Sequence, residues 1–165
     1  MAGDTYLGIE NITGTVYRDS LTGNGEANRL SGGGAFDVLV GGDGADTLAG
    51  GSGADTVTGG AGADVFLFET YADRTDVITD FVGGVDVVQI NAAAYGFGTA
   101  TGAINPNAFA SGTTGLPQDA SDRFIYNTTN GTLWFDRDGT GKVATVFLAD
   151  FADGTVFLAS DILLV

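Results

Sequence analysis

The residues with the clearest chemistry are aspartates that recur at every ninth position among glycines. From Gly32 to Leu67 the chain contains GGGAFDVLV, GGDGADTLA, GGSGADTVT and GGAGADVFL, which is Gly-Gly-x-Gly-x-Asp-x-U-x with U a large apolar residue. Aspartate carboxylates and the carbonyls of glycine-rich turns are oxygen donors, and the chain contains no His and no Cys. Such a donor set suits a hard cation, above all calcium.

The same nine-residue frame extends upstream to Gly14, which gives six windows in register. The sixth positions hold Asp19, Asn28, Asp37, Asp46, Asp55 and Asp64. The eighth positions hold Leu21, Leu30, Leu39, Leu48, Val57 and Phe66. The fourth position is glycine only in the last three windows, because Tyr17, Glu26 and Ala35 occupy it further upstream. A flexible Gly/Asp-rich linker has no reason to keep a large apolar residue at every ninth position, so the pattern indicates a folded array.

The spacing predicts how the windows stack. In each x-U-x tripeptide an apolar residue lies between two others, which is the alternation of a short β-strand. The glycines permit the preceding tight turn, because they adopt positive φ without steric cost. Two windows complete a coil of 18 residues, and successive turns on one edge then lie roughly 4.8 Å apart. Asp37 would stack on Asp55 and Asp46 on Asp64, which requires a cation between the like charges.

The nonapeptide resembles the repeat of the RTX (repeats-in-toxin) family. The resemblance implies an all-β fold, a right-handed parallel β-roll, over residues 14–67. It also implies several calcium ions held between turns on both edges of the roll. It further implies a secreted, extracellular protein that is exported by the type I secretion apparatus of a Gram-negative bacterium.

When the family's sites are carried onto matching positions, two places for calcium stand out. One lies between turns 32–37 and 50–55, and the other between turns 41–46 and 59–64. A site between turn 23–28 and turn 41–46 is weaker, because Asn28 replaces the aspartate and Glu26 replaces a glycine. The candidate ligands are Asn28, Gly32, Gly34, Asp37, Gly41, Asp43, Gly44, Asp46, Gly50, Ser52, Gly53, Asp55, Gly59, Ala61, Gly62 and Asp64.

Residues 75–90, TDVITDFVGGVDVVQI, resemble the segment that follows the roll in serralysin-type C-terminal regions. The pattern predicts two strands on either side of Gly83-Gly84. The resemblance implies a cap that completes the last calcium sites, whereas a plainer interpretation makes the same aspartates turn and edge residues. The candidate ligands in this region are Asp73, Asp76 and Asp80.

Composition excludes several classes of function. The formal net charge is −15 with only 6 Lys and Arg residues, so no basic patch is available for nucleic acid. Hydrophobic residues make up 44% of the chain, which argues against disorder, and cation sites explain the acidity better. Without His and Cys, zinc sites, disulfides and Ser-His or Cys-His catalysis are excluded. No apolar run of about 18 residues predicts a membrane span.

These patterns divide the chain into three parts. Residues 1–13 are predicted to form a lead-in strand, because YLGIENITGT resembles the segment before β-rolls, and to follow an upstream domain of a larger parent protein. Residues 14–67 form the roll. Residues 68–165 form an antiparallel β cap, which should cover the outward apolar side chains of Val65 and Leu67, since an open sheet end invites edge pairing.

Within the cap the sequence predicts one clear hairpin. Arg123–Asn127 and Thr132–Asp136 flank Asn130-Gly131, a pair that favours a type I′ turn. A strand follows over Val143–Leu148, and residues 91–121 precede the hairpin as a long loop with one helical turn near Pro106–Ala110. The aromatic residues predicted to form a second small core are Tyr126, Trp134 and Phe135.

Two further segments have alternative interpretations. Asp136-Arg-Asp138-Gly139 resembles the start of an EF-hand loop but lacks the later acidic ligands, so it is either a calcium site or a hairpin turn. Residues 159–165 resemble the acidic and apolar end of a type I secretion signal, and they also suit a last strand that closes the cap.

The sequence therefore predicts a non-catalytic, calcium-folded module of a secreted protein. Its expected partners are calcium, the upstream domain and the type I secretion apparatus, with no nucleic acid and no membrane span. One alternative is an accessory, substrate- or surface-binding module of a secreted carbohydrate-active enzyme, lipase or protease. Another is the end-piece of an adhesin or surface-layer protein. The scarcity of cations disfavours direct binding to an anionic polymer such as alginate.

Overall fold

The computed structural model describes residues 10–139 and 145–165. Regular structure in these residues is β-strand apart from two short 3₁₀ turns, so the all-β class is confirmed. The predicted lead-in strand over residues 1–13 and the predicted strand Val143–Leu148 lie partly outside the described residues. In the described ranges no helix is long and apolar enough to cross a membrane.

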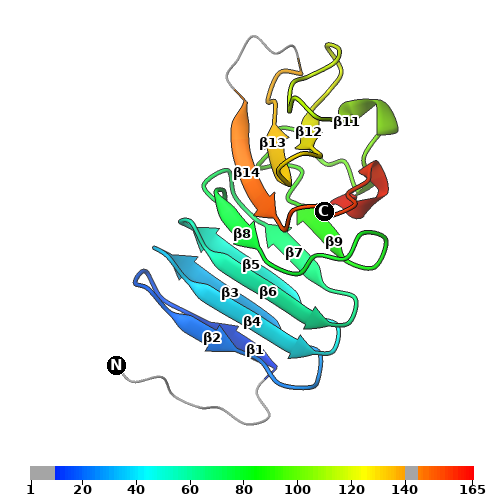
Figure 1. Cartoon of the computed structure of the whole chain (residues 1–165). Coiled ribbons are helices and arrows are strands. Elements are labelled where there is room, and N and C mark those ends of the chain that lie inside the picture. The colour runs from blue at the N-terminus through cyan, green and yellow to red at the C-terminus, as the bar shows by residue number, and fades with distance from the viewer. Residues whose placement is uncertain (1–9, 140–144) are drawn as a thin grey trace.

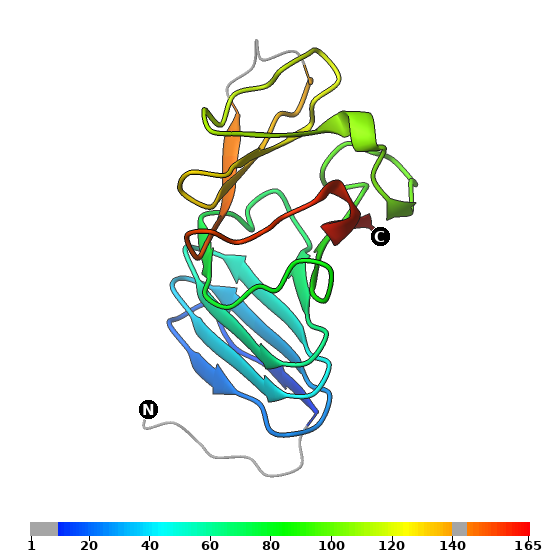
Figure 2. The same cartoon turned by 45° about the vertical axis from the view of Figure 1, so that its right-hand side comes forward.

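The repeat region forms the predicted parallel β-roll. Successive strands alternate between two sheets, and the strands stack as rungs below the cap (Figure 1, Figure 2). One sheet contains β1 (Asn11–Thr13), β3 (Arg29–Gly34), β5 (Thr47–Ser52) and β7 (Val65–Phe68). The other contains β2 (Ser20–Thr22), β4 (Val38–Asp43) and β6 (Thr56–Ala61). Leu30 pairs with Leu48 and Leu39 with Val57, which confirms the predicted register.

The strands extend beyond the predicted tripeptide into the glycines of the next window. Gly33 pairs with Gly51 and Gly42 with Gly60 in the parallel ladders. The second glycine of the window has positive φ, +102° at Gly33 and +105° at Gly60. A Cβ on Gly60 would lie 1.9 Å from the carbonyl oxygen of Gly42. The turns therefore stack closely only because these positions are glycine.

The cap continues both sheets of the roll. β8 (Asp76–Ile78) pairs in parallel with β6, and β9 (Val87–Ile90) pairs in parallel with β7. The chain later returns to each sheet, where β14 (Val146–Phe151) pairs with β8 and β15 (Ile162–Leu164) pairs with β9, again in parallel. The last strands of the roll thus have no open edge. Leu67 is buried, as the sequence predicted, whereas Val65 is only half-buried.

The antiparallel part of the cap lies at the end far from the roll. β12 (Phe124–Asn127) and β13 (Thr132–Phe135) form the predicted hairpin, and β13 pairs antiparallel with β14. The type I′ turn is wrong. Such a turn needs a two-residue connection with positive φ at both residues, whereas positive φ occurs here at Gly131 and not at Asn130.

Residues 91–121 contain more structure than the predicted loop. The helical turn is present as η1 (Pro106–Ala108), which Asn105 caps by accepting the N–H of Asn107. The short strands β10 (Gly102–Ala103) and β11 (Phe109–Gly112) were not predicted, because small residues and glycines give them no alternating pattern. β10 pairs antiparallel with β15, and β11 pairs in parallel with β12. A second 3₁₀ turn, η2 (Ala159–Asp161), precedes β15.

Roll and cap share one hydrophobic core. Leu39 of the roll and Phe135 of the hairpin belong to the same buried cluster. Phe81 connects the two parts, since its ring centroid lies 5.8 Å from that of Phe66 and 5.1 Å from that of Phe151. The prediction of a second small core is therefore wrong, because the cap strands extend the sheets of the roll and their inner faces meet in the same interior.

Replacement of a stacking glycine should disrupt the roll. In Gly62→Ala the new Cβ would lie 1.6 Å from the carbonyl oxygen of Gly44 at a residue with φ of +149°. We expect the free energy of unfolding in saturating calcium, measured by denaturant titration, to fall by at least about 2 kcal/mol. Gly25→Ala is the control, because its Cβ would meet no atom within 4 Å. Equal stability of the two variants would contradict the stacking argument.

Candidate metal sites

The sixth-position aspartates lie inside the roll and form one column along each edge. In the first column Asp37 Oδ1 accepts the backbone N–H of Asp19 at 2.8 Å, and Asp55 Oδ1 accepts that of Asp37 at 2.7 Å. The matching bonds of the second column join Asn28 to Asp46 and Asp46 to Asp64. Each carboxylate therefore reaches back to the turn one coil earlier and fixes the stacking of the two turns.

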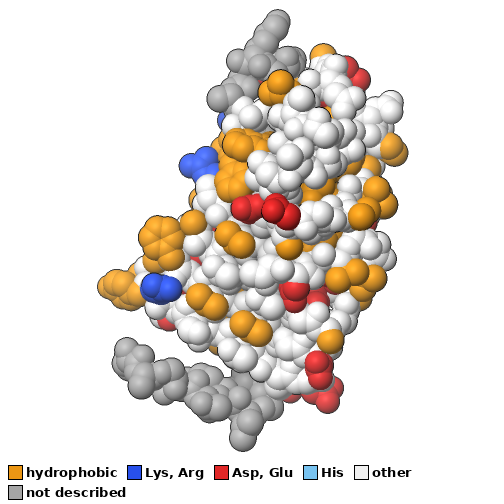
Figure 3. All heavy atoms as spheres, in the orientation of Figure 1, with side chains coloured by type: hydrophobic (Ala, Val, Ile, Leu, Met, Phe, Trp, Pro, Cys, Tyr) orange, Lys and Arg blue, Asp and Glu red, His pale blue; other side chains and the backbone are white. Residues whose placement is uncertain are grey.

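The second oxygen of these carboxylates has no hydrogen-bond partner. Among the described residues, the buried side-chain oxygens without a partner are Oδ2 of Asp37, Asp46, Asp55 and Asp64. None of the four residues is more than 2% exposed, and Figure 3 accordingly shows only scattered acidic side chains on the face it presents. Burying a carboxylate without a counter-charge is costly. The four oxygens therefore fit a bound cation.

A backbone carbonyl of the next turn borders the same space. A Cβ on Gly32 would lie 2.4 Å from Asp37 Oδ2 and 2.6 Å from the carbonyl oxygen of Gly50. The equivalent group on the other edge consists of Gly41, Asp46 and Gly59. A carboxylate and a carbonyl from consecutive turns thus surround a small space that any residue larger than glycine would fill. These are the pairs of turns between which the sequence predicted calcium.

Within the described part of the chain, the side chains of Asp19 and Asn28 in the first two turns have no buried oxygen without a partner. Asp19 Oδ2 accepts the backbone N–H of Thr15 at 2.6 Å and its hydroxyl at 2.8 Å. Asn28 Oδ1 accepts the backbone N–H of Asn24 at 2.7 Å. The oxygen that is unpaired in later turns is therefore occupied by a hydrogen bond here. Turn 23–28, the weaker predicted site, lacks the feature that marks the other four turns.

Two aspartates of the cap continue the columns above the last repeats. Asp76 Oδ1 accepts the N–H of Asp55 at 3.0 Å, and Asp86 Oδ1 accepts that of Asp64 at 2.9 Å. The separations are 21 and 22 residues, whereas the roll keeps 18. Asp76 was a predicted ligand, but Asp86 was missed. Only register counting that allows for inserted residues could have found it.

The other two predicted cap ligands use both carboxylate oxygens in hydrogen bonds. Asp73 Oδ2 accepts the N–H groups of Glu69 and Thr70, and its Oδ1 accepts the Thr70 hydroxyl. Asp80 accepts the N–H groups of Gly59 and Gly60, one with each oxygen. Asp73 therefore closes its own loop, although it keeps the nine-residue spacing. Asp80 caps the glycine pair of the last repeat.

The predicted calcium ligands in the glycine-rich turns can contribute mainly backbone carbonyl oxygens. The side chains of Asp43 and Ser52 are exposed, unlike those of the column aspartates. Within the described residues, no three acidic side chains are grouped so as to hold a metal by themselves. Backbone carbonyls must therefore supply much of any coordination shell, as the oxygen preference of calcium allows. The remaining predicted backbone candidates in these turns are Gly34, Gly44, Gly53, Ala61 and Gly62.

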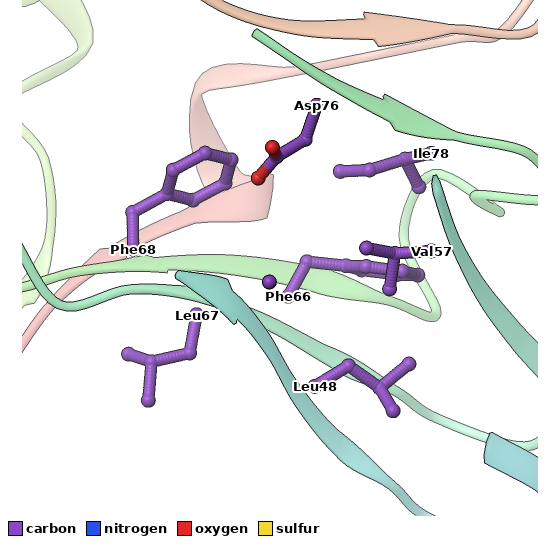
Figure 4. Close-up of a pocket in the computed structure, with 8 residues that line it drawn as sticks. Leu48, Val57, Phe66, Leu67, Phe68, Asp76 and Ile78 are labelled. Atoms are coloured by element: carbon purple, nitrogen blue, oxygen red, sulfur yellow. The ribbon is translucent and has the colours of Figure 1, made fainter. Parts of the chain in front are cut away.

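Burial raises the pKa of the column carboxyls. Desolvation is the largest cause for Asp37, Asp46, Asp55 and Asp64, and hydrogen bonds from the earlier turn lower the pKa in part. Desolvation raises the pKa of Asp55 to about 6 and that of Asp76 to about 8. Figure 4 shows the Asp76 carboxylate among apolar side chains that include Phe68 and Ile78. A nearby cation would favour the ionised form at each position.

The repeat also matches a known family. The model described as the RTX calcium-binding nonapeptide repeat (4 copies) matches residues 4–39 and 31–66. The repeat region is an RTX array. The matched residues thus form a calcium-binding RTX region, and these repeats bind several calcium ions.

A solved structure supports the fold of the whole chain. The solution structure of the AlgE6R3 subunit from the Azotobacter vinelandii mannuronan C5-epimerase is similar, with a TM-score of 0.59 and 24% sequence identity. The likeness covers 96% of this chain and 85% of that subunit. At this identity it concerns the fold, a β-roll with its cap. No curated protein sequence matches the chain.

Loss of one column charge should remove one calcium ion. Asp55→Asn keeps an oxygen that can accept the N–H of Asp37 but removes the negative charge at Oδ2. We expect isothermal titration calorimetry to show one ion fewer and at least about tenfold weaker apparent calcium affinity. Asp19→Asn is the matched control, since Thr15 already occupies the Asp19 oxygen, and it should change the affinity less than about twofold. Equal effects would contradict the assignment.

The raised pKa values predict that a fall in pH stabilises the calcium-free fold but weakens calcium binding. Without calcium the folded state holds more protons than the unfolded state between pH 3.8 and about 8, so its stability should rise as the pH falls from 8 to 5. With calcium, protons compete for the same oxygens, so apparent calcium affinity should fall over that range. In chelator, circular dichroism should therefore show β structure increasing as the pH falls from 8 to 5, and calcium titration over the same range tests the second sign. Asp76→Asn should flatten the calcium-free response between about pH 6 and 8.

Proposed function

We propose that this chain is a secreted module that remains unfolded at the low calcium level inside the cell and folds on binding calcium outside. The observation that carries the proposal is the set of four buried carboxylate oxygens without a hydrogen-bond partner. Without cations these charges oppose the stacking of the turns. With cations they hold consecutive turns together, so calcium binding and folding are coupled.

The charge balance of the chain supports this mechanism. The formal net charge is −15, and one ion at each of the four oxygens would contribute about eight positive charges. Extracellular calcium sites typically have affinities in the roughly millimolar range. By mass action, millimolar calcium outside the cell stabilises the folded state, and the much lower level inside does not. In this proposal the roll supports the export and subsequent folding of a larger parent protein.

The position of the C-terminal residues fits export before folding. Residues 159–165 resemble a type I secretion signal, and in the folded chain they form η2 and β15. β15 lies between β9 and β10 in one sheet, and Asp161 is buried. A secretion apparatus could bind this segment only in an unfolded chain. A fold that waits for extracellular calcium leaves the segment accessible until export is complete.

A second candidate is an accessory module of a secreted carbohydrate-active enzyme. The similar solved structure is a subunit from a mannuronan C5-epimerase, which is the observation that favours this alternative. A polar hollow of the cap lies beside η1 and β11, and Asp119 and Asp122 line it without a basic residue. An acidic hollow repels a polyanion, so any glycan bound there would be neutral or cationic. The calcium-dependent fold would serve this role equally.

Removal of calcium should unfold the RTX module. Far-ultraviolet circular dichroism and size-exclusion chromatography in EDTA should show loss of β structure and a larger hydrodynamic radius, with recovery in about 5 mM calcium. Magnesium at the same concentration should not restore the fold, because it demands a tighter octahedral shell.

Matched variants separate the ion sites from general acidity. Asp46→Ala and Asp55→Ala should raise the calcium concentration needed for folding far more than Asp153→Ala, since Asp153 is exposed. The same circular dichroism spectrum in EDTA and in calcium would sink the proposed function.

A further inference from the structure

The last repeat on one edge is followed by a loop instead of another window. Residues 69–75 lie over turn 50–55, where Asp73 forms a bridge with Gly53 and the Thr75 hydroxyl donates to the Gly53 carbonyl at 3.0 Å. Asp76 follows at once and accepts the N–H of Asp55. This loop therefore occupies the place that turn 50–55 itself occupies above turn 32–37.

In a regular repeat the next turn supplies a backbone carbonyl oxygen to the ion, and here the loop must supply a replacement for it. At Gly32 the atoms nearest to an added Cβ include the carbonyl oxygen of Gly50 from the next turn. At Gly50 the three nearest atoms all belong to Asp55. No carbonyl oxygen of the loop comes as close to Gly50 as the Gly50 carbonyl comes to Gly32. Asp55 Oδ2 is nevertheless buried and without a partner. The position of the loop therefore decides which oxygens complete a shell around Asp55.

The loop is held in a conformation that it would not adopt by itself. Thr75 has φ of +73°, which is rare for a β-branched residue. Such a conformation persists only where the surroundings determine it. One constraint is the hydrogen bond from the Thr75 N–H to the carbonyl oxygen of Leu148 in the cap strand β14.

The second constraint comes from a tyrosine that follows β9. The hydroxyl of Tyr95 lies 2.9 Å from the carbonyl oxygens of both Thr70 and Asp73, to which it donates. The Tyr95 side chain is 1% exposed, and its ring centroid lies 5.7 Å from that of Tyr71 and 5.3 Å from that of Phe135. The shared core thus fixes the ring of Tyr95, and the hydrogen bonds of its hydroxyl fix the loop relative to that core.

We propose that Tyr95 is a positioning residue for the calcium site at Asp55. The hydroxyl holds residues 69–75 above turn 50–55, so that this site is complete only when the cap core is packed. The cap and the last calcium ion on this edge would then stabilise each other. This inference rests on the proposed site at Asp55, and it goes beyond that site by assigning its closure to a buried residue of the cap.

Tyr95→Phe tests the role, because it removes the hydroxyl and keeps the ring in the core. Tyr126→Phe is the matched control, since Tyr126 is also 1% exposed and its hydroxyl donates to one carbonyl, that of Thr155, at 2.9 Å. The full chain is titrated with calcium while NMR follows the backbone amides of Gly53 and Gly62, which report the two edges separately. Denaturant unfolding in saturating calcium measures the general destabilisation of each variant.

We expect Tyr95→Phe to raise the calcium midpoint of the Gly53 signal about fivefold, as the loss of one buried hydrogen bond allows. The Gly62 midpoint should change less than about twofold, and Tyr126→Phe should change both midpoints less than about twofold. Equal Gly53 shifts in the two tyrosine variants, or parallel shifts of Gly53 and Gly62 in Tyr95→Phe, would overturn the positioning role.

Asp55→Asn separates failure of this inference from failure of the site itself. If Asp55→Asn shifts the Gly53 midpoint and Tyr95→Phe does not, only the role of Tyr95 falls. If Asp55→Asn leaves the Gly53 midpoint unchanged, the calcium site at Asp55 is wrong and the role of Tyr95 falls with it.

Discussion

A carboxylate buried between stacked turns is the constraint on which the rest of this structure depends. One oxygen of Asp37 accepts a backbone N–H from the preceding coil, which fixes the stacking. The other oxygen has no protein partner. A buried anion of this kind is tolerable only beside a cation. The glycines follow from the same constraint, because Gly32 leaves the space beside that oxygen open and Gly33 lets consecutive turns approach.

Aspartates also mark the two ends of the calcium-dependent part of the roll. Asp19 directs its second oxygen to the N–H of Thr15, and Asp86 directs its own to the N–H of Val82 at 2.7 Å. These turns close by hydrogen bonds within the protein and need no ion for that purpose. The dependence on calcium is therefore concentrated in the four turns between Gly32 and Asp64. The turns at either end resemble them in geometry but not in electrostatics.

The cap is not an independent domain attached to a metal-bound rod. β8 and β9 lengthen the two sheets of the roll, and Phe81 packs between Phe66 of the roll and Phe151 of the cap. Packing of the cap and stacking of the last calcium turns are thus coupled through this core. This arrangement suits a chain that must remain unfolded until calcium is present, because the roll gives the cap a complete core only when its turns are stacked.

The sequence by itself determined the features that recur with a fixed period. The register of 18 residues, the buried apolar column through Leu39 and the aspartate column through Asp55 follow from local spacing, since each window repeats the same short-range interactions. Only the tertiary structure decided that Asp76 and Asp86 continue the columns while Asp73 closes its own loop. It also decided that hairpin and roll share one core and that Tyr95 holds the last loop. Inserted residues break the period, and contacts between segments more than 20 residues apart, such as Tyr95 with Asp73, depend on how the whole chain packs.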